Sequence, residues 1–325
     1  MKLLIKGMLC ASLVVSSVQS KESIKVAAKE PTAMKSTAAD IEIITSENAD
    51  GKITPASIEQ AFKDAGFVIS ANRDMNGPFE IQFKESGFDI YNLFTLYKPD
   101  AVLELVKKYP NVGLFAPMSM SIYTKKGEKK ISVSSLTAEA MAKIMKAPSD
   151  DKTLHDLRAL VKQTLKKAMP NGSYETLPYV QTEPKGELVT SFSMEMDPDE
   201  WEDQLDEFKM GFEGELAPNG FVIAGHNNLG DDFEESNYEA FNFYEVYSVC
   251  KLPVIYTIAK TRPEAGAYAP CSLYLSKKKD EEEMHIGFPS VYNWMSSMAI
   301  ESKEDMEVLE KAQAGMNKIL TGLTE

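Results

Sequence analysis

Two cysteines and two histidines in the C-terminal half are the residues of this sequence best suited to chemistry. Cys250 and Cys271 lie close together along the chain, and His226 and His285 flank them on either side. Thiolates and imidazoles are common protein ligands of Zn²⁺ and of copper, and four of them can surround one ion tetrahedrally. The spacing matches no zinc-finger pattern, so a metal site at these four residues depends wholly on how the chain folds.

The cysteine pair also has simpler interpretations. In an oxidising compartment a disulfide is the first expectation for Cys250 and Cys271. It would close a loop of about 22 residues and stabilise the fold by roughly 3 kcal/mol in the chain-entropy account. Two inert buried thiols and a reactive dithiol are the alternatives. A disulfide requires the two Cα atoms to lie within about 7 Å of each other.

The first twenty residues have the pattern of a secretion signal. Lys2 and Lys6 supply a positive start, a short apolar run follows, and small residues precede a cleavage point after Ser20. The run is far shorter than the ~20 apolar residues that a membrane-spanning helix needs. We therefore expect an exported protein, in a bacterial periplasm or secreted, with residues 21–40 as a disordered tether. A lipoprotein anchored through Cys10 is the alternative.

Composition and charge narrow the possible partners. The chain has 325 residues, of which 43% are hydrophobic and 26% charged, and its formal net charge is −14. This length and composition suit two globular domains with cores of their own. Because an acidic surface repels phosphate backbones, we expect no nucleic-acid partner.

An internal repeat organises the chain. Residues 88–128 align without a gap with residues 241–281, and twelve of these 41 positions are identical. The matches include five sites that shape the backbone or carry charge: Tyr91/Tyr244, Lys98/Lys251, Pro110/Pro263, Gly113/Gly266 and Ala116-Pro117/Ala269-Pro270. One register held over so long a stretch indicates a duplication. Two copies of one unit also make an intramolecular pseudo-dimer possible.

The shared pattern predicts the elements of each copy. Apolar residues recur at helical spacing after Lys98 and stop at Pro110, which cannot extend a helix. Residues 118–122, Met-Ser-Met-Ser-Ile, alternate with period two, as in a strand covered on one side. A turn at residues 125–127 then leads into a second strand and predicts a hairpin. Each copy ends in helices, and Ser302 has the position of an N-cap for the last one.

Each copy therefore reads strand, helix, strand, strand, helix, hairpin, helices. The fold class that we predict is α+β, with two tandem copies of a small antiparallel-rich sheet and helices packed on one face. We place the first repeat domain at residues 41–170 and the second at residues 186–325. Residues 171–185 contain two prolines and no periodicity, and we interpret them as the linker.

This layout resembles the domain-of-unknown-function family 302, whose members occur singly or as tandem repeats. The resemblance covers nearly all of residues 41–169 and 186–324, and it rests on hydrophobic and turn patterns. It implies a small α+β fold with an antiparallel sheet and no established activity. Many relatives carry cysteines at the end of the middle strand and after the proline that opens the hairpin. Only the second copy matches here, through Cys250 and Cys271, because the first copy has Tyr97 and Met118.

No catalytic motif stands out, since the sequence has no phosphate-binding glycine loop, serine nucleophile elbow, HExxH or CxxC. The leading hypothesis is an uncharacterised periplasmic protein that binds or interacts without catalysis, with a groove for a small ligand or protein partner between the two halves or on the exposed sheet faces. The alternative is a thiol redox or metal- or haem-handling protein that uses Cys250 and Cys271. Neither the ligand nor a cofactor follows from the sequence.

Overall fold

The two halves of the chain contain the same helices and strands in the same order. The computed structural model describes residues 39–325. The first half contributes β1 (Ile41–Glu47), α1 (Pro55–Asp64), β2 (Val68–Asp74), α2 (Asn76–Phe83), β3 (Phe88–Tyr97), α3 (Pro99–Val106), the 3₁₀ turn η1 (Val112–Leu114), β4 (Met118–Lys125), β5 (Lys130–Leu136), α4 (Ala138–Met145), α5 (Lys152–Ala168) and β6 (Ser173–Tyr174).

The second half repeats this series, except that no counterpart of β6 follows among the described residues. Its elements are β7 (Val189–Glu195), α6 (Trp201–Leu216), β8 (Val222–Asn228), α7 (Leu229–Glu235), β9 (Phe241–Cys250), α8 (Leu252–Ala259), the 3₁₀ turn η2 (Pro263–Tyr268), β10 (Cys271–Lys278), β11 (Glu283–Pro289), α9 (Val291–Ser297) and α10 (Lys303–Thr324).

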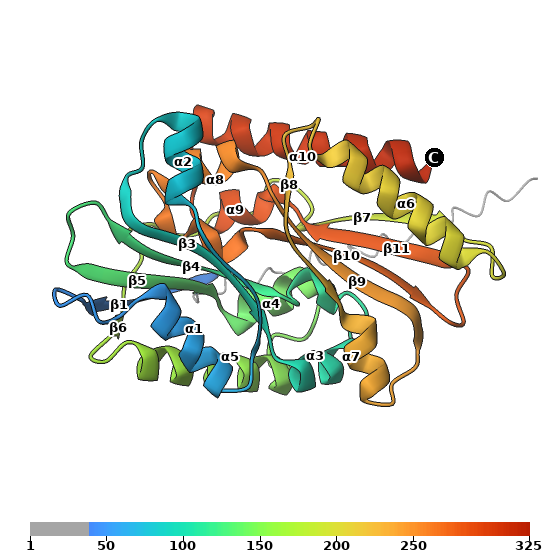
Figure 1. Cartoon of the computed structure of the whole chain (residues 1–325), viewed down its shortest axis with the longest axis horizontal. Helices are drawn as coiled ribbons and strands as arrows, with labels where there is room; N and C mark the ends of the chain where they lie inside the picture. The colour runs from blue at the N-terminus through green and yellow to red at the C-terminus, as the bar shows by residue number, and fades with distance from the viewer. Residues whose placement is uncertain (1–38) are drawn as a thin grey trace, which may run out of the picture. The chain divides into compact units, whose positions relative to one another are not determined.

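Each half forms one antiparallel sheet, and the two sheets have the same strand order (Figure 1). The first runs β2-β3-β4-β5-β1, with β6 added at the β1 edge, and the second runs β8-β9-β10-β11-β7. The predicted fold class, α+β with an antiparallel sheet in each copy, is therefore confirmed. All described residues belong to one compact unit, so contacts between the two halves are part of the fold.

Helix ends follow the local sequence. Thr54 caps α1 with a reciprocal capping box to Ser57, and Asp151 caps α5. The predicted cap at Ser302 is present, because its side chain accepts a hydrogen bond from the backbone N–H of Asp305. The last helices of the two copies, α5 and α10, lie on opposite sides in Figure 1.

Each sheet is covered on both faces. Helices cover one face: Phe62 of α1 contacts Phe94 of β3, and Phe212 of α6 contacts Tyr247 of β9, with ring centroids 5.6 and 5.4 Å apart. The opposite face of each sheet packs against the other repeat. This arrangement explains why the middle strands β3 and β9 are buried along most of their length without alternation.

The alternating strand β4 therefore differs from its predicted environment. Ser119 and Ser121 were expected to face solvent, yet both are buried against the second repeat. Their hydroxyls donate hydrogen bonds to backbone carbonyl oxygens of Pro270 and Pro263, at 2.8 and 3.0 Å. A buried hydroxyl needs such a partner, and the other copy supplies it.

Contacts between the repeats come in reciprocal pairs, as at a two-fold dimer interface. In each pair, equivalent hydroxyls of the two copies donate to equivalent backbone carbonyl oxygens. In the first pair, Tyr91 Oη donates to Pro263 O at 3.0 Å and Tyr244 Oη to Pro110 O at 2.7 Å. In the second pair, Ser119 Oγ donates to Pro270 O at 2.8 Å and Ser272 Oγ to Pro117 O at 2.9 Å. The positions that are identical in sequence therefore meet across the interface. The two repeats form a pseudo-dimer within one chain.

Two equivalent glycines allow this close approach. A Cβ atom added to Gly113 would lie 2.4 Å from Cβ of Tyr274, and one added to Gly266 would lie 2.4 Å from Cβ of Ser121. Real Cβ atoms do not approach so closely, so only glycine fits at either turn. The identity of Gly113 and Gly266 in the repeat thus has a packing cause.

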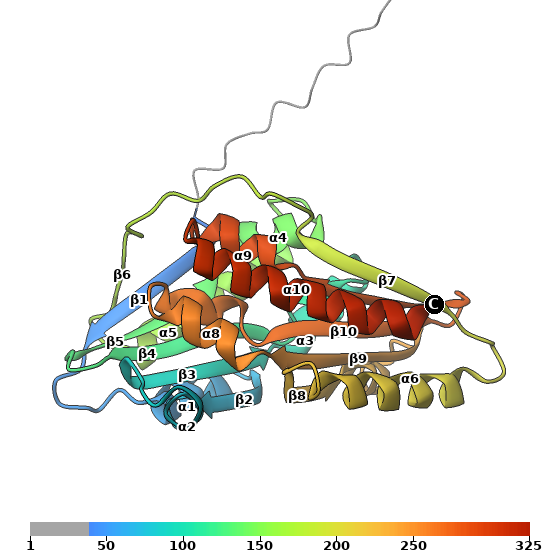
Figure 2. The same ribbon diagram turned by 90° about the horizontal axis from the view of Figure 1, so that it is seen from above.

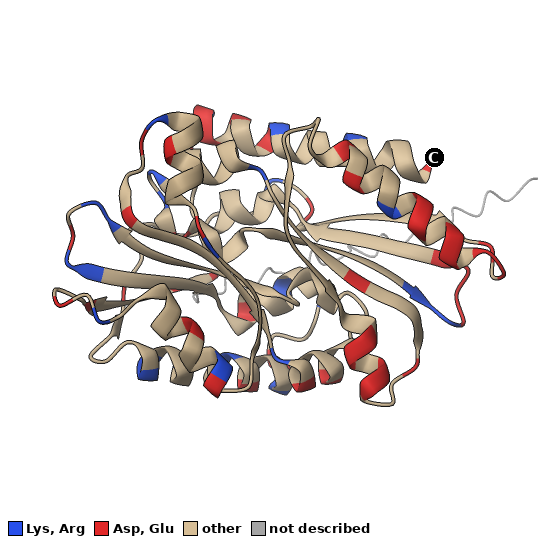
Figure 3. Cartoon of the chain, viewed as in Figure 1, with Lys and Arg blue, Asp and Glu red and all other residues tan. Residues whose placement is uncertain are grey.

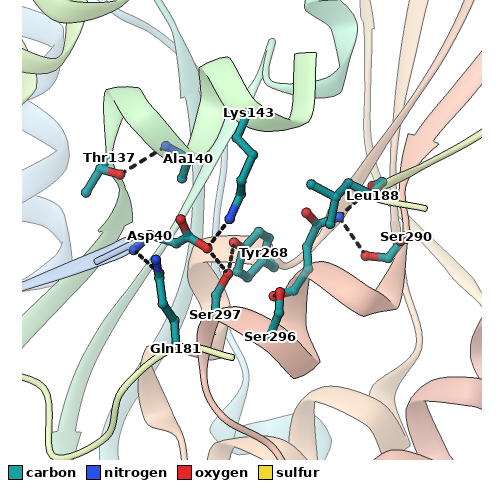
Figure 4. A network of polar contacts seen from close by, with 11 residues as sticks. Asp40, Thr137, Ala140, Lys143, Gln181, Leu188, Tyr268, Ser290, Ser296 and Ser297 are labelled. Carbon is teal, nitrogen blue, oxygen red and sulfur yellow. Dashed lines mark hydrogen bonds and ion pairs between the residues drawn. The ribbon is translucent and has the colours of Figure 1, made fainter. Parts of the chain in front are cut away.

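A buried polar network fixes the repeats near the start of β1 (Figure 4). The Asp40 carboxylate accepts hydrogen bonds from Lys143 of α4 at 2.5 Å and from Ser297 of α9 at 2.6 Å. The Ser297 hydroxyl also contacts the hydroxyl of Tyr268 at 2.7 Å, and the Asp40 backbone N–H donates to Gln181 at 3.1 Å. The network joins both copies and the segment between them.

The segment from β6 to β7 passes α4 and α9 (Figure 2) and is more ordered than its linker sequence predicts. Residues 173–174 pair with β1, and the backbone N–H of Thr182 donates to Ser296 O at 2.9 Å. The Tyr179 hydroxyl donates to the buried carboxyl of Glu264 at 2.6 Å. The linker is therefore attached to both repeats.

Several predictions fall outside the described residues: the cleavage point at Ser20, most of the tether at residues 21–40, and the alternative anchor at Cys10. Between residues 39 and 325, no helix has the length and apolarity needed to cross a bilayer. The helices α2 and α7 were not predicted, because neither carries a clear apolar stripe of several turns.

Candidate ligand-binding site

The structure does not assemble the predicted four-residue metal site. His226 Nε2 pairs with Glu245 at 2.7 Å, and His285 Nε2 pairs with Glu281 at 3.0 Å. Both histidines thus have carboxylate partners apart from the cysteines. No group of three or more potential metal ligands occurs among residues 39–325.

Cys250 and Cys271 do lie together, and both are free thiols rather than a disulfide. The Cys271 thiol donates a weak hydrogen bond to the carbonyl oxygen of Tyr268, at 3.4 Å. Burial raises the pKa of each thiol to about 12, and the neighbouring sulfur adds to the rise at Cys250. Since the thiolate is the reactive form, the raised pKa disfavours thiol reactivity at neutral pH. The disulfide prediction is therefore not supported.

The two thiols line a small apolar cavity under α10, with a volume of about 60 Å³. Its walls come from the ends of β9 and β10 and from α8, α9 and α10, and they include Val254, Trp294 and Met316. The buried indole of Trp294 lies beside Cys271, and a hydrogen bond from the indole N–H to the thiol sulfur opposes part of the pKa rise at Cys271.

The equivalent space in the first repeat is nearly filled. It measures about 10 Å³ and lies between Met118, Met141 and Val161. Met118 occupies the position of Cys271 in the repeat, and Met141 that of Trp294. The longer Met118 side chain fills the volume that the shorter cysteine leaves open. The second copy therefore has a cavity that the first copy lacks.

A larger groove opens beside this cavity, between the two repeats. Its volume is about 750 Å³, and it adjoins the cavity at Phe221, Cys250 and Lys251, which line both. The first repeat contributes residues of β2, α2 and β3, and the second contributes β8 and the start of α8. Val222 and Ile223 line the groove and are 54% and 41% exposed. Adjacent exposed aliphatic side chains in a concave surface are typical of a ligand site.

At the corresponding place on the other side of the pseudo-dimer, a side-chain contact joins the two repeats. There Tyr97 stands at the position of Cys250, and its hydroxyl donates a hydrogen bond to Asp232 of α7 at 2.8 Å. Burial and the adjacent Asp232 raise the pKa of Tyr97, so the hydroxyl stays protonated as a donor. The contact between Tyr97 and Asp232 thus has no counterpart at Cys250 in the second copy.

The equivalent lysines of the two copies, Lys98 and Lys251, also differ in their contacts. Lys98 forms an ion pair with Asp100 at 2.8 Å, whereas Pro253 takes the place of that aspartate in the second copy. Within residues 39–325 no carboxylate pairs with Lys251. Its ammonium group donates to Asn219 O at 2.9 Å and lies 4.5 Å from the Phe221 ring centroid. Desolvation lowers the pKa of Lys251, which leaves a partly buried cation at the groove wall.

The sequence pointed to part of this site. Cys250 and Cys271 were singled out by their absence from the first copy, and both line the cavity. The groove residues Val222, Ile223 and Arg73 were not predicted, because the place of a side chain in the groove follows from how the repeats dock. The alignment of the two copies places Pro253 where Asp100 stands, beside the identical lysines. This difference could have indicated that Lys251 lacks the carboxylate that pairs with Lys98.

These features define a duplicated α+β protein with an open groove between its two repeats. The chain belongs to the family described as "Domain of unknown function DUF302", whose profile matches residues 42–171 and again residues 200–323. A crystal structure of an uncharacterized conserved DUF302 protein from Bacillus stearothermophilus is similar at 13% sequence identity. That similarity covers 43% of this chain and 100% of the other, with a TM-score of 0.36. No curated protein matches the chain significantly.

Proposed function

We propose that this chain is an exported binding protein that holds a small ligand, without catalysis, in the groove between its two repeats. The observation that carries the proposal is the difference between the two sides of the pseudo-dimer. One side is closed by the pair Tyr97–Asp232, and the other side keeps an open volume of about 750 Å³. Pockets of several hundred Å³ with mostly apolar walls are the usual sites for small ligands.

The surroundings of the thiols favour binding over reaction. Cys250 and Cys271 are the nearest potentially reactive groups, and burial holds both pKa values at about 12. A periplasmic or secreted location rests on the residues up to Ser20, which have the pattern of a secretion signal. In such a compartment the protein would collect its ligand directly from outside the cytoplasm.

The proposal is tested by blocking the groove and comparing the equivalent position in the first repeat. Val222 and Val68 both follow the glycine–phenylalanine step, and both are exposed, but only Val222 lines the groove. We expect V222W to lower the affinity for Nile red, a neutral apolar dye, at least tenfold, while V68W leaves it unchanged. Fluorescence titration of the folded variants measures both values. Equal binding by wild type and V222W would place the dye elsewhere and contradict the proposal.

A further inference from the structure

The charged groups of the groove indicate what kind of ligand it suits. Lys251 lies where the groove meets the inner cavity, and Arg73 lines the groove from the first repeat. Neither cation forms an ion pair with a carboxylate anywhere in residues 39–325. The one carboxylate of the lining, Asp74, accepts a hydrogen bond from the backbone N–H of Asn76 at 3.0 Å. Two cations therefore face the groove without an ion pair, and Asp74 is the one carboxylate in the lining beside them.

The environment of Lys251 favours an anionic ligand beside its unpaired charge. A buried or half-buried ammonium group is costly without an anionic partner. The carbonyl of Asn219 and the ring of Phe221 satisfy it only in part. The equivalent Lys98 has its own carboxylate, Asp100. The second repeat has lost this partner and gained open space at the same place.

The remaining walls are apolar. Leu93 of β3, Val222 of β8 and Leu252 of α8 present aliphatic side chains to the groove. Burial of an alkyl chain against such walls contributes roughly a fourfold gain in affinity for each methylene group. A ligand that satisfies both the walls and the cations must combine an alkyl chain with a negative head group.

We propose that the groove binds an amphipathic monoanion, with a carboxylate head group at Lys251 and an alkyl chain along Leu93, Val222 and Leu252. This proposal rests on the proposed function and names the ligand class for the same site. Arg73 supplies additional positive potential at the outer wall.

The net charge of the protein does not prevent this binding. Helices α6 and α7 carry many of the acidic side chains (Figure 3), and the formal net charge is −14. At physiological ionic strength, charges more than about 8 Å away across solvent are largely screened. A partly desolvated ammonium group within contact distance therefore outweighs carboxylates that solvent separates from a bound head group.

The test compares decanoate with decanol, which share an alkyl chain and differ in the charged head. Isothermal titration calorimetry of the full exported chain should show decanoate binding at least tenfold more tightly than decanol. K251Q should abolish this preference, while the matched variant K98Q should keep it. Circular dichroism and thermal melts check that both variants are folded, and the comparison in the wild type remains informative if K251Q is not.

Each other outcome contradicts a specific part of the account. Equal affinity for decanol and decanoate, with V222W blocking both, would overturn the anionic ligand while the groove remained a binding site. An equal loss of decanoate affinity in K98Q and K251Q would place the head group elsewhere. If neither compound binds, the amphipathic ligand is wrong, and the Nile red titration alone decides whether the groove binds anything.

Discussion

At the scale of single residues, two differences between the copies decide the character of the site. The first repeat has Tyr97 and Met118 where the second has Cys250 and Cys271. The larger pair closes its side of the pseudo-dimer, and the smaller pair leaves the space open. The sequence identified these positions by comparing the two copies. From the sequence alone, we expected metal or disulfide chemistry at the cysteines. Their burial, and the carboxylate partners of His226 and His285, follow only from the fold.

Burial of the thiols predicts how stability depends on pH. In the unfolded chain a cysteine loses its proton near pH 9, whereas in the folded protein the pKa of Cys250 and of Cys271 is about 12. The stabilisation is fully present below pH 9, and it is lost as the pH rises towards 12, because unfolding then releases protons. Denaturant melts of the wild type should therefore show the free energy of unfolding falling between pH 9 and 10.5.

The double variant C250A/C271A isolates the contribution of the thiols to this dependence. Over the same pH range, its free energy of unfolding should fall less steeply than that of the wild type. The two slopes should differ by about 1 to 2 kcal/mol per pH unit. The variant is expected to be less stable at every pH, since alanine enlarges the cavity, so the slope is the quantity to compare. Identical slopes in the two proteins would show that the thiols titrate normally.

At the scale of elements, periodicity predicted the strands and the last helices but not their surroundings. The strand at residues 118–122 has alternating serines, which normally face solvent, and here they meet the other copy. A sequence pattern reports polarity, and a hydroxyl is equally satisfied by water or by a carbonyl of a neighbouring domain. The short helices α2 and α7 escaped prediction because residues 76–83 and 229–235 are too short for a clear helical stripe.

The turns before β4 and β10 give a test of the reciprocal packing. G113A and G266A should each destabilise the protein by about 1 to 3 kcal/mol, because the added methyl group meets the Cβ atom of Tyr274 or of Ser121. The control G87A has no atom within 4 Å of the new methyl group and should change little. Chemical denaturation measures all three. A large effect at only one of the two interface glycines would contradict the pseudo-two-fold arrangement.

At the scale of the whole molecule, duplication supplies both the architecture and the site. The identical residues Tyr91 and Tyr244 bond to equivalent carbonyls across the interface, so they maintain the docking of the copies. The differing residues lie at the groove and determine whether each side is open. The sequence indicated the two copies and predicted a groove either between them or on the exposed sheet faces. Which side opens depends on a three-dimensional contact, Tyr97 with Asp232, between residues far apart in the chain.

The central claim is that the open groove exists because the second copy lacks the tyrosine of the first. The most direct measurement is the stoichiometry of Nile red binding to C250Y, which places a tyrosine at the equivalent position, with Y97F as the matched control in the closed side. The wild type and Y97F should each bind one dye molecule per chain, and folded C250Y should bind none. If C250Y binds the dye as the wild type does, the groove beside Cys250 is not the binding site.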